Sequence, residues 1–189
     1  ETGLAQNITL SADLLAYGLP SEMHPLWGEW AATIANNFTT TTSERLIFAG
    51  FVPLALAAYI IIRRRFSRVV RFWALTAGLF FILSLGPFLH INGQMVTLAG
   101  RPLPMPYLLL YHTVPFINLT RSLSRYSLMV MLSLGVLATL ALTHLSTGEL
   151  RNTKYTIWNA LWVRHSKFTI QNSKLLPLLA SLLILFEFL

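Results

Sequence analysis

The sequence contains no cysteine and few charged residues, which make up 11% of its 189 residues. Without cysteine there are no disulfides, no Cys-ligated zinc or iron–sulfur clusters and no thiol catalysis. The shortage of charge excludes a disordered chain and disfavours an ordinary soluble domain, which carries about 25% charged residues. Glycine-rich phosphate loops, nucleophile elbows and paired-histidine zinc motifs are also missing. We therefore expect no metal and no cofactor.

Apolar residues make up 54% of the chain, and their arrangement predicts an all-α integral membrane protein. A helix needs roughly 20 predominantly apolar residues to cross a bilayer. We expect about four transmembrane helices, the last of them truncated, over residues 46–62, 72–89, 126–145 and 175–189. Because this last run stops without a polar flank and the chain does not begin with Met, we interpret the sequence as a piece of a longer protein.

Prolines interrupt two of the predicted helices. Pro53 would lie inside the first one, where contacts with neighbouring helices can satisfy the carbonyl group that proline leaves unpaired. Gly86-Pro87 is expected to kink or end the second helix, because proline lacks the amide that a continuing helix needs.

The fourteen Lys and Arg residues are distributed unevenly along the chain. Five lie in the connection 63–71 and five in the connection 146–174, and short loops rich in these residues stay in the cytoplasm. Residues 1–45 and 90–125 hold the other four and are expected outside the cell membrane. The net charge of +7 is therefore mostly a topology signal. It predicts membrane lipid as the partner and no nucleic acid.

The soluble stretches have structural signals of their own. Aromatic residues recur at helical spacing in 25–35 and 155–163, which is typical of helices lying in the lipid headgroup layer. Packing of these aromatics against the protein's own helices is the alternative. Asn92-Gly93 between alternating apolar positions predicts a short outer hairpin. The proline-rich and then apolar segment 102–117 is too short to span and suits a re-entrant or interfacial segment.

Two residues of the first outer segment are candidates for chemistry. Asp13 could act as a general base, although Ser11 or Asp13 could equally cap a helix. His24 could bind a metal together with Glu22 and Glu29, but their spacing matches no known ligand motif. Neither residue has a partner that the sequence identifies.

Arg121 and Arg125 form the more informative pair. They lie four residues apart, hence on one face if the segment is helical, and directly outside the third predicted span. With Ser122 and Ser124 they could hold a phosphate or diphosphate at the membrane surface. The alternatives are contact with ordinary lipid phosphates or an ion pair within the protein. Glu187 is the one charged residue in a predicted span and therefore needs a partner or a cavity. Either Arg121 or Arg125 could be that partner.

Several strings of this sequence together resemble one protein family. In order and spacing they resemble the later part of large bacterial multi-pass membrane proteins of the YfhO-like, GT-C glycosyltransferase-like group, over roughly residues 8–145. The family often has a proline at the position that Leu123 occupies here. The strings are 11–20 (SADLLAYGLP), 24–28 (HPLWG), 85–90 (LGPFLH), 103–107 (LPMPY), 114–118 (VPFIN) and 121–126 (RSLSRY).

The resemblance implies transfer of a sugar from a polyprenyl-phosphate donor at the outer face of the membrane. The catalytic acid of that group lies in an external loop upstream of the part matched here, so no catalytic residue is assigned in this chain. Arg121 and Arg125 match the family's arginine motif, which implies a place near the lipid-phosphate donor. The alternative is a non-catalytic membrane protein, either a lipid or polymer exporter or an accessory subunit.

Overall fold

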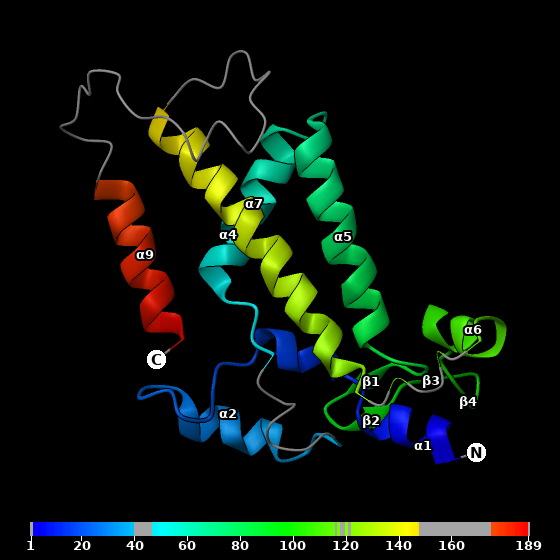
Figure 1. The fold of residues 1–189 in the computed structure, drawn as a ribbon. Helices are drawn as coiled ribbons and strands as arrows, with labels where there is room; N and C mark the ends of the chain where they lie inside the picture. Colours follow the sequence, from blue (N-terminus) through cyan, green and yellow to red (C-terminus); the bar gives the residue numbers. More distant parts are fainter. Residues whose placement is uncertain are drawn as a thin grey trace.

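The computed structural model describes residues 2–39, 47–115, 117, 120, 122–147 and 175–188. Within these ranges the protein is mostly helical, with seven α-helices, two short 3-10 helices and four strands of two residues each (Figure 1). The predicted interfacial helix at 155–163 and the rest of the basic connection 146–174 beyond Thr147 lie outside the described residues.

Four helices extend between the two ends of the molecule, with α7 in contact with the other three (Figure 1). The turn between α4 and α5 lies at one end, together with the C-terminal end of α7. The beginning of α4, the end of α5 and the end of α9 lie toward the other end. The four helices are α4 (Phe51–Arg63), α5 (Arg68–Ser84), α7 (Ser127–Thr147) and α9 (Leu175–Glu187).

The remaining elements gather at the end of the bundle opposite the α4–α5 turn (Figure 1). We call this assembly, residues 2–39, 85–115 and 122–126, the platform. It is built from short helices and two antiparallel hairpins. Its elements are α1 (Thr2–Thr9), η1 (Leu14–Gly18), α2 (Gly28–Ala35), β1 (His90–Ile91), β2 (Gln94–Met95), β3 (Thr97–Leu98), β4 (Arg101–Pro102), α6 (Pro106–Thr113) and η3 (Ser124–Tyr126).

Among the described residues, one helix is long and apolar enough to cross a membrane, the continuous stretch Ser124–Leu145. The prediction of about four such helices is therefore wrong by this measure. The helices α4 and α9 are apolar but contain 13 residues each, and α5 contains 17. At 1.5 Å per residue, α4 is only about 20 Å long.

The late start of α4 explains why this helix is shorter than predicted. The helix begins at Phe51, and Pro53 lies in its first turn, where the missing amide removes no intrahelical hydrogen bond. Residues 47–50 precede it as a buried, non-helical segment. Within that segment the amide of Ala49 donates to the carbonyl of Tyr17 at 3.0 Å. Hydropathy alone does not separate such a buried lead-in from the helix that follows.

The boundary at Gly86-Pro87 is confirmed as a helix end. The helix α5 stops at Ser84, and Gly86 adopts a φ of 75° just beyond it. A Cβ at Gly86 would lie 2.0 Å from the Ser11 hydroxyl oxygen, so the chain passes closely here. The start of α5 at Arg68 is earlier than predicted, and the first turn of the helix therefore includes arginine.

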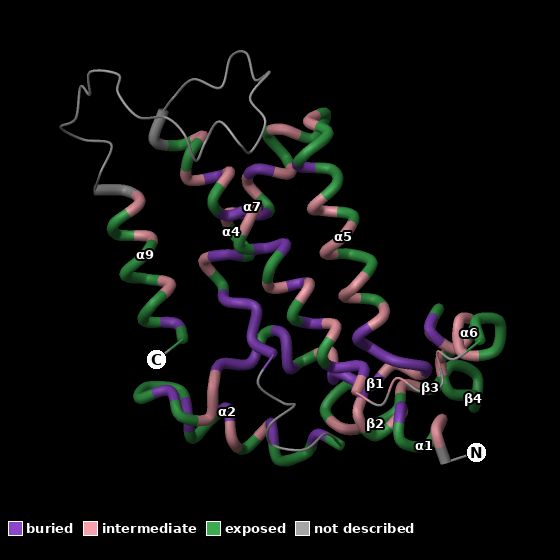
Figure 2. Tube along the Cα trace, in the orientation of Figure 1, coloured by how far each residue is buried: buried purple, intermediate pink, exposed green. Residues whose placement is uncertain are grey.

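Burial is concentrated between α4, α5 and α7 and inside the platform (Figure 2). Small buried side chains such as Ala57, Ser133 and Ala141 let the helix backbones approach closely. The outward faces are apolar as well as the core. The exposed large apolar residues include Val69, Phe72, Leu75, Leu79 and Ile82 on α5 and Leu178, Leu179, Leu182, Leu183, Leu185 and Phe186 on α9.

The predicted hairpin at Asn92-Gly93 is confirmed. His90 pairs with Met95 and Ile91 with Gln94, which leaves Asn92 and Gly93 as a two-residue turn. Their φ angles of 54° and 76° are those of the turn type that matches strand twist. A second hairpin, β3–β4, follows directly and was not predicted.

Candidate functional site

Asp13 is a buried side chain of the platform that accepts three backbone hydrogen bonds. It is 3% exposed, and its Oδ1 accepts hydrogen bonds from the amides of Leu15 at 2.9 Å and Asn92 at 3.1 Å. Its Oδ2 accepts from the amide of Gly93 at 2.7 Å. Asp13 is thus the N-cap of η1, one of its two predicted roles, and also ties η1 to the turn of the first hairpin. This geometry favours an anchor over a general base.

The same turn is held from its other side by the end of α2. The side-chain amide of Asn37 donates to Oδ1 of Asn92 at 3.0 Å. At Gly93, an added Cβ would lie 1.7 Å from the carbonyl oxygen of Asn37. The turn therefore sits between Asp13 and the backbone of residue 37, with no room for a side chain at Gly93.

His90 lies beside this anchor and is also buried. Burial lowers the pKa of His90, an effect partly offset by a backbone hydrogen bond at Phe88 and by the nearby Asp13 carboxylate. His90 is therefore neutral at neutral pH. Among the described residues, no group bonds its Nδ1 atom.

Two buried tyrosines connect the platform to other elements. The Tyr17 hydroxyl lies 2.5 Å from the Ser84 hydroxyl at the end of α5, and burial raises the pKa of Tyr17 to about 12. The Tyr107 hydroxyl accepts from the side-chain amide of Asn7 at 3.3 Å, which joins α6 to α1. Burial, reinforced by Tyr126 and Tyr111, raises the pKa of Tyr107 to about 12. Both tyrosines therefore act as neutral hydrogen-bonding anchors.

His24 uses both ring nitrogens. Its Nδ1 accepts from the amides of Leu26 at 3.1 Å and Trp27 at 3.3 Å. Its Nε2 must then carry the hydrogen and donate to the carbonyl of Phe186 at 3.1 Å. Within the described ranges, no group of three His, Asp or Glu side chains could hold a metal ion. His24 thus links the platform to the end of α9.

Glu187 finds its partner in a helix terminus. Both carboxylate oxygens accept from the amide of Val52, at 3.0 and 3.1 Å, and the residue is 8% exposed. Val52 lies in the first turn of α4, whose N-cap Gly50 offers no side chain. A carboxylate at a helix N-terminus also interacts favourably with the helix dipole. The sequence indicated that Glu187 needs a partner, but not that the partner is a backbone amide.

Arg125 lies at the junction of the platform with α7. It is exposed in η3, and the residue before it, Ser124, is buried. The amide of Ser124 donates to the carbonyl of Leu10 at 3.1 Å, and its hydroxyl lies 3.1 Å from that of Ser122. The backbone next to Arg125 is therefore fixed to the end of α1. Arg121 lies outside the described residues.

Five of the six strings on which the family resemblance rests meet in the platform, as far as their residues are described. Each of these five strings contributes at least one anchor, by which we mean a buried polar side chain or a buried glycine. The strings are far apart in the sequence. Asn7 is an anchor outside the strings; its neighbour Gln6 carries the same amide group but is exposed, so no local signal singles out Asn7. The anchors within the strings are Asp13, Tyr17, His24, Gly86, His90, Tyr107 and Ser124.

Over the described residues, the fold and the site define a mostly helical protein, with one helix of membrane-spanning length and a platform held by buried polar side chains. No protein-family model matches the chain, and we find no similar protein among curated sequences or solved structures.

Proposed function

We propose that this chain is a membrane-embedded part of a multi-pass protein of the GT-C glycosyltransferase type. Its role would be to position a polyprenyl-phosphate-linked sugar at the outer face, while the catalytic acid lies elsewhere. The observation that carries the membrane placement is the apolar outer surface of the bundle, on α5 and α9 above all. Soluble proteins rarely expose so much contiguous apolar surface.

The short helices are compatible with this placement. Non-helical backbone is tolerated at membrane depth where it is buried in protein. The segment before α4 is buried, and the first turn of α4 receives the Glu187 carboxylate. A span can therefore consist of α4 and its lead-in together, although α4 alone is too short.

The orientation follows from the arginines. Five of them occupy residues 63–71 at the α4–α5 turn, which places that end in the cytoplasm by the charge rule. The platform is then on the outer side of the cell membrane. Trp30 of α2 is 58% exposed there, and Leu26 and Trp27 are exposed beside it. For Leu26 and Trp30 this favours contact with the headgroup layer, whereas Trp27 also stacks on the His24 ring within the protein.

This orientation predicts a labelling pattern. A cysteine introduced as Ser67→Cys is the only thiol in the chain, because the natural sequence has none. We expect it to resist a membrane-impermeant maleimide in intact cells and to react after the membrane is permeabilised. Gly100→Cys in the second hairpin serves as the control and should label in intact cells. Labelling of Ser67→Cys from outside would reverse the proposed orientation.

The donor-binding role rests on Arg121 and Arg125. Guanidinium groups bind phosphate oxygens through paired hydrogen bonds, and Arg125 lies where the platform meets the membrane helix. Replacing both residues by Ala in the intact protein should weaken binding of a polyprenyl-phosphate donor about tenfold or more. The measurement is donor affinity in detergent. Arg101→Ala, an exposed arginine of the same platform, should leave the affinity unchanged. Unchanged affinity in the double variant would exclude the role.

A non-catalytic membrane protein is the second candidate. It is favoured by the bonding of Asp13, His24 and Glu187, each of which is committed to backbone groups. Transfer of radiolabelled sugar by membranes that contain the full-length protein, with and without a polyprenyl-phosphate donor, separates the two. Donor-dependent transfer supports the glycosyltransferase, and binding without transfer supports the exporter or accessory subunit.

A further inference from the structure

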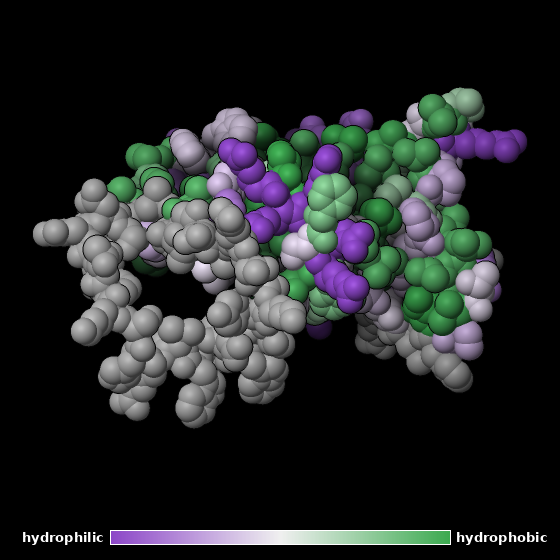
Figure 3. Space-filling model, turned by 90° about the horizontal axis from the view of Figure 1, so that it is seen from above, coloured by the Kyte–Doolittle hydropathy of each residue, from purple (hydrophilic) through white to green (hydrophobic). Residues whose placement is uncertain are grey.

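The turn between α4 and α5 has a basic hollow that neither candidate function uses. The hollow has a volume of about 460 Å³ and lies at the end of the molecule opposite the platform. Figure 3, which views this end, shows hydrophilic side chains gathered among apolar ones. Its lining residues are Arg63, Arg64, Phe66, Ser67, Arg68 and Val69.

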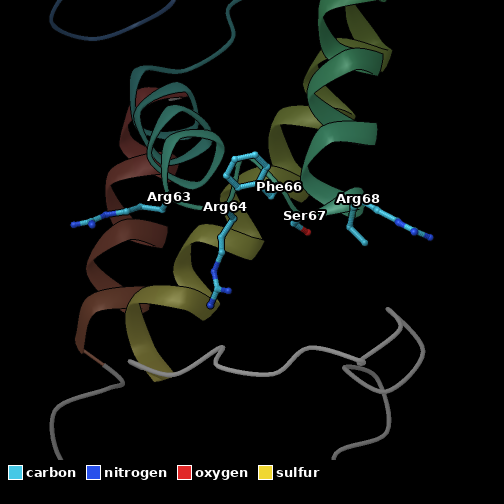
Figure 4. A pocket seen from close by; sticks show the side chains of 6 residues that line it. Arg63, Arg64, Phe66, Ser67 and Arg68 are labelled. Carbon is cyan, nitrogen blue, oxygen red and sulfur yellow. The ribbon is translucent and has the colours of Figure 1, made fainter.

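The arginines of the hollow are spread rather than convergent. Figure 4 shows Arg63 and Arg68 pointing to opposite sides, with Arg64 extending between them. The phenyl ring of Phe66 lies in the middle, and this residue is 79% exposed. A single small anion could not contact all three guanidinium groups in this arrangement. Neighbouring phosphate groups of a lipid layer could do so.

These charges do not stabilise the helix that begins beside them. Arg68 is the first residue of α5, and no acidic residue lies in its first turn. Positive charge at a helix N-terminus is unfavourable, because the helix dipole is already positive there. An anion bound at the turn would compensate both the dipole and the arginines.

An apolar stripe leads away from the hollow along α5. Its members recur at helical spacing of three or four residues and are all exposed large apolar side chains. The stripe begins at Val69, which also lines the hollow, and ends near the platform. A ligand that has both a phosphate group and a long apolar tail matches the hollow and stripe together. The stripe consists of Val69, Phe72, Leu75, Leu79 and Ile82.

In the proposed membrane placement, the length of α4 with its lead-in puts the hollow near the level of lipid phosphates. The 13 residues of α4 span about 20 Å, against a hydrocarbon core of roughly 30 Å. In the membrane placement proposed above, the lead-in 47–50 and α4 together just cover this thickness, so the arginines at the end of α4 do not lie far out in water. They extend to the headgroup layer instead, as long basic side chains do.

We propose that the hollow and the stripe form a binding site for an acidic phospholipid of the cytoplasmic leaflet. The phosphate lies in the hollow, where the long side chains of Arg64 and Arg68 can turn toward it, and an acyl chain follows the stripe on α5. The site rests on the proposed membrane placement, but not on sugar transfer or on Arg121 and Arg125.

Native mass spectrometry of the full-length protein in detergent tests this site. Phosphatidylglycerol and phosphatidylcholine with identical acyl chains compete for binding, and the wild type should prefer phosphatidylglycerol. The double variant Arg64→Gln, Arg68→Gln should lower that preference about tenfold. The matched control Arg65→Gln, Arg71→Gln removes the same charge from two arginines that do not line the hollow, although Arg65 contacts the Phe66 ring, and should retain most of the preference.

Two further measurements distinguish binding of a lipid from binding of free phosphate. Long-chain phosphatidylglycerol should bind more tightly than a short-chain form, and millimolar inorganic phosphate should not compete. Equal losses in the two double variants would overturn the site in favour of general charge attraction. Competition by phosphate would overturn it in favour of a small-anion site. Equal retention of both lipids by the wild type would overturn this inference alone, whereas retention of neither would contradict the membrane placement as well.

Discussion

Replacing Asp13 by Ala is expected to destabilise the protein by about 4 kcal/mol, because it leaves three backbone amides of the platform without their acceptor. Hydrogen bonds to a charged group contribute about 1.5–3 kcal/mol each, and relaxation of the turn recovers part of the loss. The total stability of a folded domain is only about 5–15 kcal/mol. The measurement is thermal unfolding of the purified protein, with hydrogen exchange at Asn92 and Gly93 as a local readout.

Two variants make this result specific. Glu29→Ala removes an exposed carboxylate of the same platform and should change stability by less than about 0.5 kcal/mol. Asp13→Asn keeps one carbonyl oxygen as an acceptor and should lie between the wild type and Asp13→Ala. If Asp13→Asn instead kept full stability and lost sugar transfer, Asp13 would have a role in chemistry rather than in anchoring.

Replacing Gly93 by Ala should have an effect of similar size, about 3 kcal/mol or more, for a steric reason. The φ of 76° alone costs a residue with a Cβ about 1–2 kcal/mol. The new methyl group would also lie 1.7 Å from the carbonyl oxygen of Asn37, which forces the hairpin away from α2. Loss of the Asp13 bonds follows. The same unfolding measurement reports the effect.

The second hairpin supplies a control for the part of this stability loss that comes from the positive φ angle. Gly100 has a φ of 79°, close to that of Gly93, but a Cβ there would meet nothing within 4 Å. Gly100→Ala should therefore cost only about 1–2 kcal/mol. The difference between the two alanine variants measures the contact with Asn37. Equal losses at the two positions would show that this contact relaxes freely.

Local signals predicted the parts of the fold that local chemistry determines. Asn92-Gly93 suits a turn with two positive φ angles, and Gly86-Pro87 ends a helix, wherever in a protein they occur. The start of α4 was not predictable in this way. Residues 47–50 are as apolar as the helix after them, and their non-helical path depends on contacts with the platform, such as the bond to Tyr17.

In the candidate site, too, local bonds were predictable from the sequence and long-range bonds were not. The role of Asp13 as a cap follows from its neighbours in sequence, because a carboxylate bonds to amides one turn ahead. Its bonds to Asn92 and Gly93 join residues about 80 positions apart, and no local pattern predicts them. Glu187 is a second example. The sequence indicates that a carboxylate in an apolar helix needs a partner, but only the fold identifies that partner as the amide of Val52.

The hydrogen bond between Glu187 and Val52 also determines when α4 completes its hydrogen bonding during synthesis. The acceptor for this amide is synthesised 135 residues after it. While the ribosome adds the intervening residues, the first turn of α4 lacks that carboxylate, and a buried amide without an acceptor is costly. The helix α4 therefore reaches its final, fully bonded state only after α9 has been made.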